Sequence, residues 1–392
     1  MEKILFDLTK TQPMNGTMFH GGAKYGIAVF KKLAEIAPEK IVAYYDASKY
    51  LDEGILKLCR LKNILMKEKQ EGSIINISKE YGGVLYSPLM NSRYLIDSSI
   101  HIITTIHGLR VLELPYDENE VFYKRIPLNC VSVVRHLYKF LLKRKRLKEY
   151  TRELSYQRDA LTRENVAFVT VSNHSKYSLQ TFVPSINKKE VRVFYSPSTI
   201  DDSVLEPPTC SNEVGKYYLI VSGNRWVKNG VRAIIALDEL FTDHPEVEGK
   251  VVVSGIKFKS EISVNIKNID RFVFVGYVDE IKLKELYRNA YLLVYPSLNE
   301  GFGYPPLEAM HEGCAVVASA TASIPEVCGD SVLYFNPYSV AEIKMRILQM
   351  EDESVRNYYI KKGYEREACV RRKQDEDLEK MARYILSFVK ND

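Results

Sequence analysis

Short apolar runs alternate with longer amphipathic segments along the whole chain. In the first half, seven runs of six to eight residues are rich in β-branched and aromatic side chains, a composition typical of strands. They cover residues 3–8, 40–46, 73–78, 82–87, 101–108, 166–172 and 191–197. A polar turn and a segment of helical periodicity follow most of them. Strands that alternate with helices in this way predict a parallel, doubly wound α/β sheet.

The second half of the chain repeats this order. Its predicted strands cover residues 217–223, 250–255, 271–276, 291–297 and 314–320, and its clearest helices cover 231–241 and 279–290. From residue 339 onward the pattern is helical. The polar, proline-bearing stretch at 199–215 is typical of a linker. We therefore predict two Rossmann-like domains, 1–198 and 216–368, and a C-terminal helix at 369–392 that packs back on the N-terminal domain.

Length and composition agree with two domains. The chain has 392 residues, of which 46% are hydrophobic and 27% charged, so extended disorder and fibrous folds are excluded. The formal net charge of +5 is unevenly divided, since residues 1–200 carry a balance of +11 and the remainder a balance of −6. Opposite signs predict that the two domains bind different partners.

Much of the basic excess lies in one segment. Residues 135–158 contain nine Lys and Arg against two Glu, with leucines and a phenylalanine interspersed. This pattern predicts a basic amphipathic helix that lies on an anionic membrane surface. A solvated helix face is the alternative. No nucleic-acid-binding motif accompanies the segment, so we do not expect nucleic acid as a partner.

The cysteines and the N-terminus indicate a reducing compartment. Six cysteines are scattered without a C-x-x-C pair, and the first ten residues lack the pattern of a signal peptide. No apolar run approaches the roughly 20 residues of a membrane helix. We expect a cytoplasmic protein, with any membrane contact made from the inner face of the plasma membrane. No H-E-x-x-H motif, P-loop or G-x-S-x-G elbow occurs, which disfavours metallohydrolases, kinases and serine hydrolases.

The densest group of functional residue types lies at residues 295–313, directly after a predicted strand. Glu300 opens a glycine-containing turn, and two prolines favour a helix that begins just after the turn and carries Glu308. Glycines let backbone amides approach a ligand, and a helix N-terminus favours a phosphate or sugar hydroxyls. A carboxylate on each side of the turn can bind two separate sets of hydroxyls. The alternative is an ordinary βα turn in which Glu308 interacts with the helix dipole.

Glu300 and Glu308, separated by seven residues within NEGFGYPPLEAM, resemble the signature of retaining glycosyltransferase family 4, whose members have the GT-B fold. Residues 315–337 are similar to the stretch that follows in that family. The resemblance implies two Rossmann-like domains that face each other across a cleft. It also implies that Glu300 contacts the transferred sugar and that Glu308 binds the ribose of the nucleotide. The amides that would hold the sugar hydroxyls are those of Gly301, Phe302 and Gly303.

The resemblance assigns roles to residues at other strand ends. Arg225 and Lys228 would hold the diphosphate of the donor and stabilise the leaving group, so that no metal ion is needed. Asn224, beside them, is a further candidate donor-binding residue. His107 follows the predicted strand at 101–106 and would contact the sugar or position the acceptor. The aspartate that commonly follows this histidine in the family is replaced by glycine in this chain.

Two further segments carry candidates. The first contains Gly21, Gly22 and Gly26, which predict a glycine-rich turn that leads into a helix, without the G-x-G-x-x-G spacing of dinucleotide-binding folds. A similar loop in the family lies against the donor phosphates and the acceptor. The second, at 171–179, resembles a Ser-x-x-Ser-Lys turn of the family, in which Ser175 is expected to cap a helix. The residues implied are Gly22 for the donor, and Lys24, Asn173 and Lys176 for the acceptor.

The hypothesis from the sequence is a retaining, metal-independent glycosyltransferase. It would move a hexose from a nucleoside-diphosphate sugar to a glycan or lipid-linked glycan, in the synthesis of a bacterial surface polysaccharide. The acidic domain would bind the donor and the basic domain the acceptor. The alternatives are a sugar-nucleotide epimerase or phosphorylase of the same fold, and a non-catalytic glycosyltransferase-like partner subunit.

Overall fold

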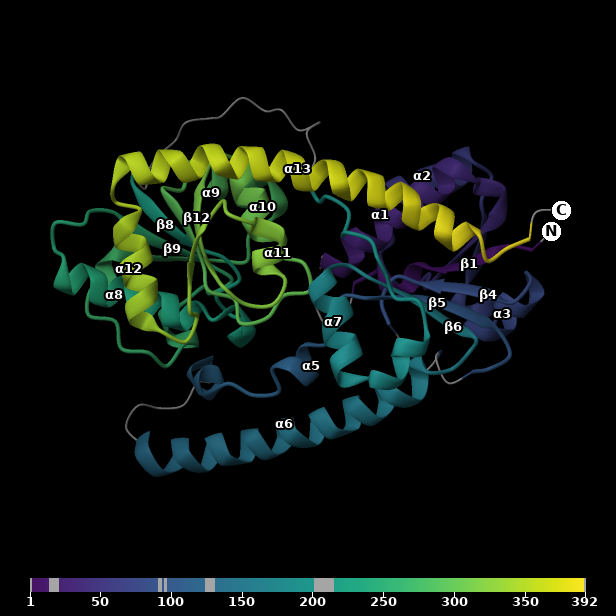
Figure 1. Cartoon of the computed structure of the whole chain (residues 1–392), viewed down its shortest axis with the longest axis horizontal. Helices are drawn as coiled ribbons and strands as arrows, with labels where there is room; N and C mark the ends of the chain where they lie inside the picture. The colour runs from purple at the N-terminus through teal and green to yellow at the C-terminus, as the bar shows by residue number, and fades with distance from the viewer. Residues whose placement is uncertain are drawn as a thin grey trace. The chain divides into compact units, whose positions relative to one another are not determined.

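The computed structural model describes residues 2–13, 21–90, 94, 97–123, 131–200 and 215–390. The chain forms two compact units, and neither is continuous in sequence (Figure 1). The first unit comprises Met1–Leu109, Arg152–Thr199 and Arg371–Asp392, and the second comprises Arg110–Thr151 and Ile200–Val370. Residues 110–151 thus belong to the second unit, although they fall in the first half of the chain. The predicted linker at 199–215 lies almost wholly outside the described residues.

A seven-stranded sheet forms the centre of the first unit, in the order β3-β2-β1-β4-β5-β6-β7. All neighbouring strands are parallel. The strands are β1 (Ile4–Asp7), β2 (Ile41–Tyr45), β3 (Leu65–Glu68), β4 (Val84–Ser87), β5 (His101–Ile106), β6 (Val166–Thr170) and β7 (Arg192–Val193). The helices between them are α1 (Gly21–Ile36), α2 (Glu53–Leu61), α3 (Ile74–Glu80) and α7 (Asn173–Phe182). This order confirms the predicted doubly wound α/β sheet.

One predicted strand of the first unit is wrong. The sequence predicts a strand at 73–78, but α3 occupies this segment. Ile74 and Ile77 are buried three residues apart, which is a helical spacing. Ser73 is the N-cap and accepts a hydrogen bond from the Asn76 backbone N–H at 3.3 Å. The strand that the sequence analysis missed, β3, is an edge strand with polar residues and lacks the apolar run of a central strand.

The glycine-rich segment after β1 also differs from the prediction. Gly21, Gly22 and Gly26 lie inside α1, not in a turn that precedes it. The glycine at position 22 permits a close approach, since a Cβ there would lie 2.7 Å from Leu89 Cδ2. The absence of a side chain therefore lets α1 pack tightly against its neighbours. Residues 14–20, which precede α1, lie outside the described ranges.

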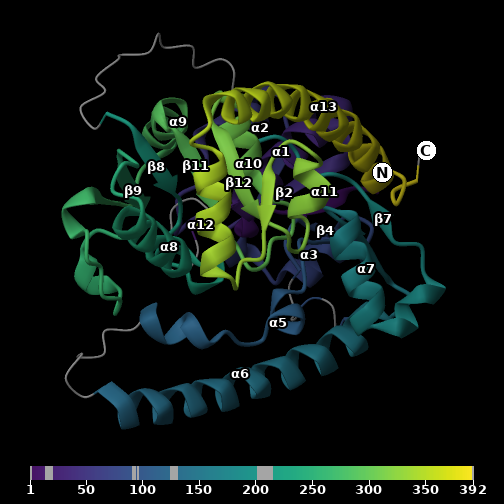
Figure 2. The same ribbon diagram turned by 60° about the vertical axis from the view of Figure 1, so that its left-hand side comes forward.

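The second unit repeats the topology with six parallel strands, in the order β10-β9-β8-β11-β12-β13. The strands are β8 (Tyr217–Ile220), β9 (Lys250–Ser254), β10 (Phe272–Gly276), β11 (Leu292–Tyr295), β12 (Ala315–Ser319) and β13 (Leu333–Phe335). The helices are α5 (Arg110–Glu113), α8 (Gly230–Asp243), α9 (Glu280–Asn289), α10 (Tyr304–His311), α11 (Ile324–Cys328) and α12 (Val340–Gln349). Figure 2 shows α9 and α10 on the opposite side of the strands from α8.

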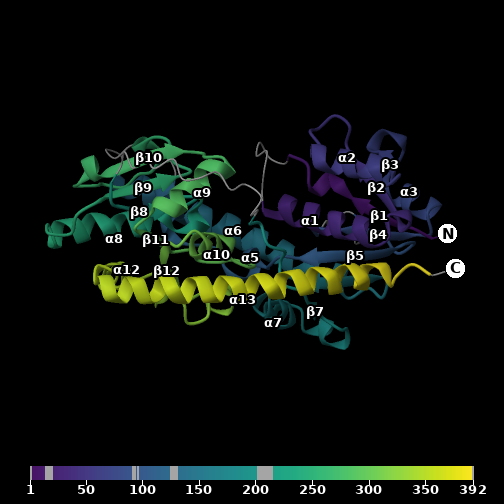
Figure 3. The same ribbon diagram turned by 90° about the horizontal axis from the view of Figure 1, so that it is seen from above.

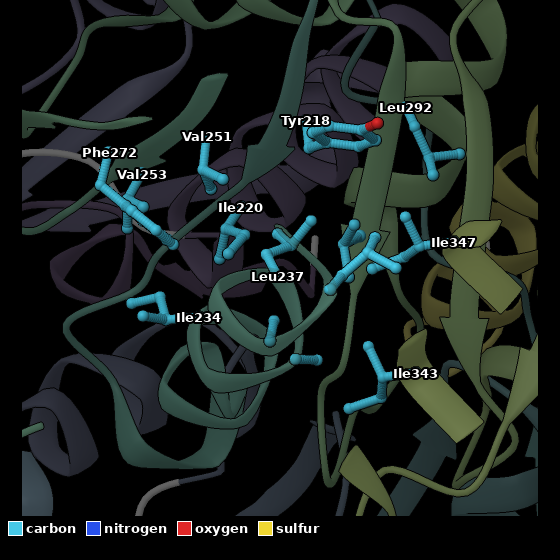
Figure 4. Packing of buried hydrophobic residues seen from close by; sticks show 14 of the residues in the cluster. Tyr218, Ile220, Ile234, Leu237, Val251, Val253, Phe272, Leu292, Ile343 and Ile347 are labelled. Carbon is cyan, nitrogen blue, oxygen red and sulfur yellow. The ribbon is translucent and has the colours of Figure 1, made fainter. Parts of the chain in front are cut away.

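Alternating residues of the central strands form the core of the second unit. Figure 4 shows this packing, in which side chains of one sheet face meet α8 and α12. The labelled members are Tyr218, Ile220, Ile234, Leu237, Val251, Val253, Phe272, Leu292, Ile343 and Ile347. Each has at most a few per cent of its surface exposed. Burial on both faces of a parallel sheet explains the continuous apolar runs seen in the sequence.

Two long helices belong partly to each unit: α6 (Val131–Leu161) and α13 (Glu353–Leu386). α13 begins well before residue 369, the predicted start of the C-terminal helix. Its C-terminal part packs in the first unit, where Asp377 Oδ2 accepts a hydrogen bond from the Tyr195 backbone N–H at 2.9 Å. Of the helices within the described ranges, none combines the length and hydropathy needed to cross a membrane.

Candidate functional site

The candidate site of the second unit lies at the point where its strand order reverses. β8 and β11 are adjacent, and their connections run in opposite directions along the sheet. Open α/β sheets bind ligands at the carboxyl ends of strands at such a position. The loop at 221–230 follows β8 and the turn at 296–303 follows β11. The topology therefore brings together two of the motifs that the sequence analysis singled out.

Glu300 is held by three hydrogen bonds to one of its carboxylate oxygens. Lys228 Nζ donates to Oε1 at 2.5 Å, the Tyr295 hydroxyl at 2.6 Å and Ser297 Oγ at 2.5 Å. The Glu300 side chain is 14% exposed and that of Lys228 is 10% exposed. The two residues form a largely buried ion pair that fixes the orientation of the carboxylate.

Opposing effects set the pKa of Glu300. Burial raises it, but the nearby Lys228 ammonium and the hydrogen bonds from Lys228, Ser297 and Tyr295 together lower it below its usual value. Burial, and then the Glu300 charge, raise the pKa of Tyr295 well above its usual value. At neutral pH the group therefore consists of an ionised carboxylate and a neutral phenol that donates to it.

We expect Tyr295→Phe to move the acidic limb of the pH–stability profile to higher pH. The substitution removes a donor that lowers the pKa of Glu300. Because the folded pKa of Glu300 is depressed, its contribution to stability is present at neutral pH and is lost as the pH falls through that pKa. The measurement is the free energy of unfolding between about pH 3 and pH 7. Tyr277→Phe, at a tyrosine that is 75% exposed, serves as the control and should leave the limb unchanged; equal profiles for both variants would contradict the expectation.

The loop after β8 presents its polar residues in two directions. Asn224 and Arg225 are exposed, whereas Lys228 points into the site. Asn229 has a left-handed φ of 58° and donates from Nδ2 to the carbonyls of Pro296 (3.0 Å) and Pro337 (2.8 Å). These bonds join the loop to the turn after β11. The predicted role of Lys228 in binding the diphosphate stays a prediction, since in this structure its ammonium is bound to Glu300.

The turn after β11 leads into α10 as predicted. Gly303 is the N-cap with a φ of 106°, which favours glycine, and α10 begins with prolines in its first turn. Ser323 Oγ donates to the carbonyls of Glu300 (2.9 Å) and Phe302 (2.7 Å) and so braces the turn. Glu308, on α10, accepts at Oε2 a hydrogen bond from the hydroxyl of Tyr287 on α9, at 3.2 Å. The predicted ligand roles of Gly301, Phe302, Gly303 and Glu308 remain predictions.

A segment that the sequence analysis placed in the N-terminal domain contributes to this site. Asp117 forms a buried ion pair with Arg232 of α8, with Arg232 Nη2 donating to Asp117 Oδ2 at 3.1 Å. Glu113 accepts a hydrogen bond from Asn299, the residue before Glu300. No local sequence pattern indicates these contacts, because the partners are more than a hundred residues apart.

Arg110, at the start of α5, is another residue that the sequence analysis missed. Its guanidinium lies 5.9 Å from the ring centroid of Trp226, next to Arg225. Burial, followed by repulsion from Arg146 and Arg225, lowers the pKa of Arg110. Within the described ranges neither Arg110 nor Arg225 forms an ion pair. Positive charge therefore accumulates beside the loop after β8, as a site for a diphosphate requires.

The remaining candidates belong to the first unit. His107 Nε2 donates to the carbonyl of Pro88 at 2.9 Å, and the ring packs edge-on against Tyr25 at 4.5 Å. A carbonyl only accepts hydrogen bonds, so Nε2 carries the proton and a ligand would have to meet Nδ1. Asn173 is the first residue of α7, and the N-cap is Ser172, not the predicted Ser175.

The other first-unit candidates differ in their surroundings. Gly22 and Lys24 lie in the first turn of α1, and Lys176 lies on α7 at the border of a groove described below. Every described residue of the site around Glu300 belongs to the second unit. Among the residues that the structure describes, no group of three or more His, Cys, Asp or Glu side chains is arranged to hold a metal ion.

Residues 208–366, about two fifths of the chain, match the family described as Glycosyl transferases group 1. The matched region contains the loop after β8, the turn after β11 and α10, and therefore every residue of the site around Glu300 except the segment that carries Asp117 and Arg110.

Two mannosyltransferases are among the relatives of the chain. O-antigen chain mannosyltransferase B of Escherichia coli is 32% identical over 170 residues, which are 40% of this chain and 44% of that protein. O-antigen chain mannosyltransferase RfbU of Salmonella typhimurium is 29% identical over 157 residues, 39% of this chain and 42% of that protein. The matched part thus spans less than half the length of either relative.

The fold is similar over the whole chain to that of a solved structure. The crystal structure of Anabaena HepE in complex with UDP and glucose matches with a TM-score of 0.63 and 13% identity, covering 99% of this chain and 100% of that one. At this identity the likeness shows the fold alone. It confirms the expected GT-B class, with two parallel doubly wound sheets and a C-terminal helix.

Proposed function

We propose that the chain is a retaining family 4 glycosyltransferase that transfers a hexose from a nucleoside-diphosphate sugar to a glycan or lipid-linked glycan. The observation that carries this proposal is the arrangement around Glu300. Three donors converge on Oε1, and among the described residues none donates to Oε2. The carboxylate is ionised and fixed in orientation, with one oxygen available to accept hydrogen bonds from sugar hydroxyls.

Charge separates when the glycosidic bond breaks. The leaving diphosphate gains negative charge while the sugar becomes oxocarbenium-like. In the proposal Arg225 stabilises the diphosphate directly, and Arg110 adds positive charge beside it. Lys228 would contact both the sugar-binding carboxylate and the leaving group, because its ammonium is bound to Glu300 and can also donate to a phosphate oxygen. These cations take the role that a metal ion has in other transferases, so we propose that the reaction needs none.

The relatives favour particular substrates. Both named relatives are O-antigen mannosyltransferases, which supports mannose as the hexose and a bacterial surface polysaccharide as the product. The HepE structure contains UDP and glucose, which supports a nucleoside diphosphate as the carrier. Within this proposal Glu308, oriented by Tyr287, binds the ribose, and its two oxygens suit the cis-diol of that sugar.

We expect Arg225→Ala to lower kcat about 100-fold, because it removes a preorganised cation from the leaving group. The measurement is steady-state transfer from GDP-mannose to a lipid-linked glycan, with thermal unfolding recorded in parallel. Lys282→Ala, at an exposed lysine on α9, is the matched control and should keep the wild-type rate. A folded Arg225→Ala protein that transfers at a near-normal rate would refute the assignment.

The same assay separates the alternatives and tests the metal. A transferase yields product only when acceptor is added, whereas an epimerase acts on the nucleotide sugar alone. Addition of a chelator should leave the rate unchanged if Arg225 and its neighbours neutralise the diphosphate. A rate that falls with chelator and recovers with a divalent cation would overturn the metal-independent mechanism.

We also propose that α6 contacts an anionic membrane surface. Leu141, Arg144, Lys145 and Lys148 are exposed and share one face of the helix. Arg146 lies on another face and donates to the buried Glu120 at 2.6 Å. The exposed cations and the leucine, 52% exposed, have the composition of an interfacial helix.

A triple charge reversal tests the membrane proposal. We expect Arg144→Glu/Lys145→Glu/Lys148→Glu to weaken binding to phosphatidylglycerol-containing vesicles on the order of 100-fold. The measurement is co-sedimentation at low and high salt. The matched control, Lys57→Glu/Arg60→Glu/Lys62→Glu, reverses three exposed cations around the end of α2 and should bind as the wild type does. Equal binding by both variants, or no binding by the wild type, would refute the proposal.

A further inference from the structure

A basic groove with a volume of about 900 Å³ lies in the first unit, and none of its lining residues belongs to the site around Glu300. It is bounded by α7, the segment around β7 and the last turns of α13, which lie side by side in Figure 3. Its charged lining consists of Lys176, Lys189, Glu190, Arg192, Lys380 and Arg383. Five cations thus face one carboxylate in a space large enough for a ligand of small-molecule size.

The aromatic side of the groove orients one of these cations. The Arg192 guanidinium lies 4.4 Å from the ring centroid of Tyr384, and Tyr384 packs against Phe194 with 6.1 Å between ring centroids. Arg192 also forms a two-point pair with Glu190, with 2.9 Å between Nε and Oε1 and with Nη2 donating to Oε2 at 3.0 Å. A guanidinium has five N–H donors, so this stacked group still has its Nη1 donors for an anion, which would compete with the exposed Glu190 carboxylate.

Two lysines of the groove have no carboxylate partner among the described residues. Lys189 is half-buried and donates to the backbone carbonyls of Val166, at 2.9 Å, and Arg163. Burial lowers the pKa of Lys189, and only the more distant charge of Glu164 raises it. Lys176 lies 5.9 Å from the ring centroid of Tyr177. Positive charge in this part of the groove is therefore not neutralised by the protein.

The other two cations stand at the outer rim. Lys380 Nζ lies 3.4 Å from Glu376 Oε2, and Arg383 Nη2 lies 2.5 Å from Glu379 Oε1. Both cations are well exposed. Their carboxylate partners lie outside the lining of the groove. An incoming anion thus meets the cations first, and the surface pairs that it competes with are weak.

We propose that this groove binds a phosphate-bearing ligand, with the phosphate between Lys176 and Arg192 and an apolar or sugar portion against Tyr384. Ammonium and guanidinium groups converge there from three separate parts of the chain, as phosphate recognition requires. The ligand is a soluble phosphate ester or a lipid headgroup. Lys176, which the sequence analysis selected as an acceptor-binding residue, belongs to this groove. The proposal uses no residue of the site around Glu300 and does not depend on the proposed function.

The test measures binding of glycerol 3-phosphate by calorimetry, and of phosphatidylglycerol vesicles against pure phosphatidylcholine vesicles by co-sedimentation. We expect Lys176→Glu/Arg383→Glu to weaken binding at least about 10-fold, since each charge-assisted hydrogen bond contributes that much or more. Lys57→Glu/Arg60→Glu, the same charge change on α2 of the same unit, should bind as the wild type does. Binding of the soluble ester identifies a phosphate-ester site. Vesicle binding that Lys176→Glu/Arg383→Glu weakens, without binding of the ester, identifies a headgroup site and separates it from vesicle binding through α6.

A second variant guards against misfolding. Arg192→Lys keeps the charge but loses the planar, stacked donor pair, and it should weaken binding while thermal unfolding stays unchanged. Failure of the wild type to bind either probe, or an equal loss in the α2 control, would overturn the proposal. A wild-type protein that binds phosphate in this groove but transfers no sugar would count only against the proposed function.

Discussion

Glu300→Gln should lower the transfer rate about 100-fold or more. The neutral amide cannot balance the Lys228 ammonium, and it presents an N–H group where the sugar hydroxyls require an acceptor. In the proposed mechanism the carboxylate interacts most strongly with the sugar as positive charge develops on it, so the loss should appear in kcat. The measurement is steady-state kinetics at neutral pH with a nucleotide sugar and a glycan acceptor.

The control separates catalysis from folding. Glu285→Gln changes an exposed carboxylate on α9 that pairs with Lys282, and it should retain full activity. Glu300→Gln also leaves the Lys228 ammonium largely buried and unpaired, so we expect a lower unfolding temperature as well. Glu300→Gln/Lys228→Met removes that unpaired charge and should recover stability without recovering activity. A double variant that regains transfer would show that Glu300 acts only in folding.

Arg232→Ala should destabilise the second unit by about 3–5 kcal/mol, the usual cost of removing one partner of a buried ion pair. The Arg232 side chain is 10% exposed and that of its partner Asp117 is 5% exposed. Arg232 also donates to Asn229 Oδ1 at 2.8 Å. Its loss leaves the Asp117 carboxylate buried without a counter-charge. The measurement is urea unfolding combined with hydrogen exchange, which should rise first in residues 110–123.

A surface ion pair of the same unit provides the comparison. Lys344 contacts Asp243 at 2.7 Å and Glu239 at 3.1 Å, and both carboxylates are at least half exposed. Lys344→Ala should leave the unfolding midpoint essentially unchanged, because water and salt screen such pairs. If the two variants were equally stable, the contact between Asp117 and Arg232 would not be what holds residues 110–123 to the second unit.

The sequence was sufficient for the architecture because both sheets are parallel and buried. Their central strands are continuous apolar runs, so the ends of β8, β9, β11 and β12 could be predicted to within three residues. The error at 73–78 arose because three isoleucines in six residues fit both a strand and the buried face of a short helix. β3 was missed because an edge strand exposes one side and need not be apolar.

The site was predictable only in part. The turn that carries Glu300 and the prolines of α10 follow from local rules of helix initiation. The pairing of Glu300 with Lys228 joins residues 72 positions apart, and it depends on β8 lying beside β11. The ion pair of Asp117 with Arg232 joins residues 115 positions apart, and α6 lies between them in the sequence. Such contacts depend on tertiary packing, which no local pattern encodes.

The discontinuous units have a consequence for the order in which the protein can fold as it is synthesised. Domains generally fold in the order in which they leave the ribosome. Here the first unit lacks the segment Arg371–Asp392 until the whole of the second unit has been made. The hydrogen bonds from the Tyr195 N–H to Asp377 and from Gln374 to the Ser196 carbonyl can form only after that segment has been made. The half of the protein that is synthesised first is therefore completed last, and a ribosome that stops before residue 371 releases a chain in which that half is unfinished.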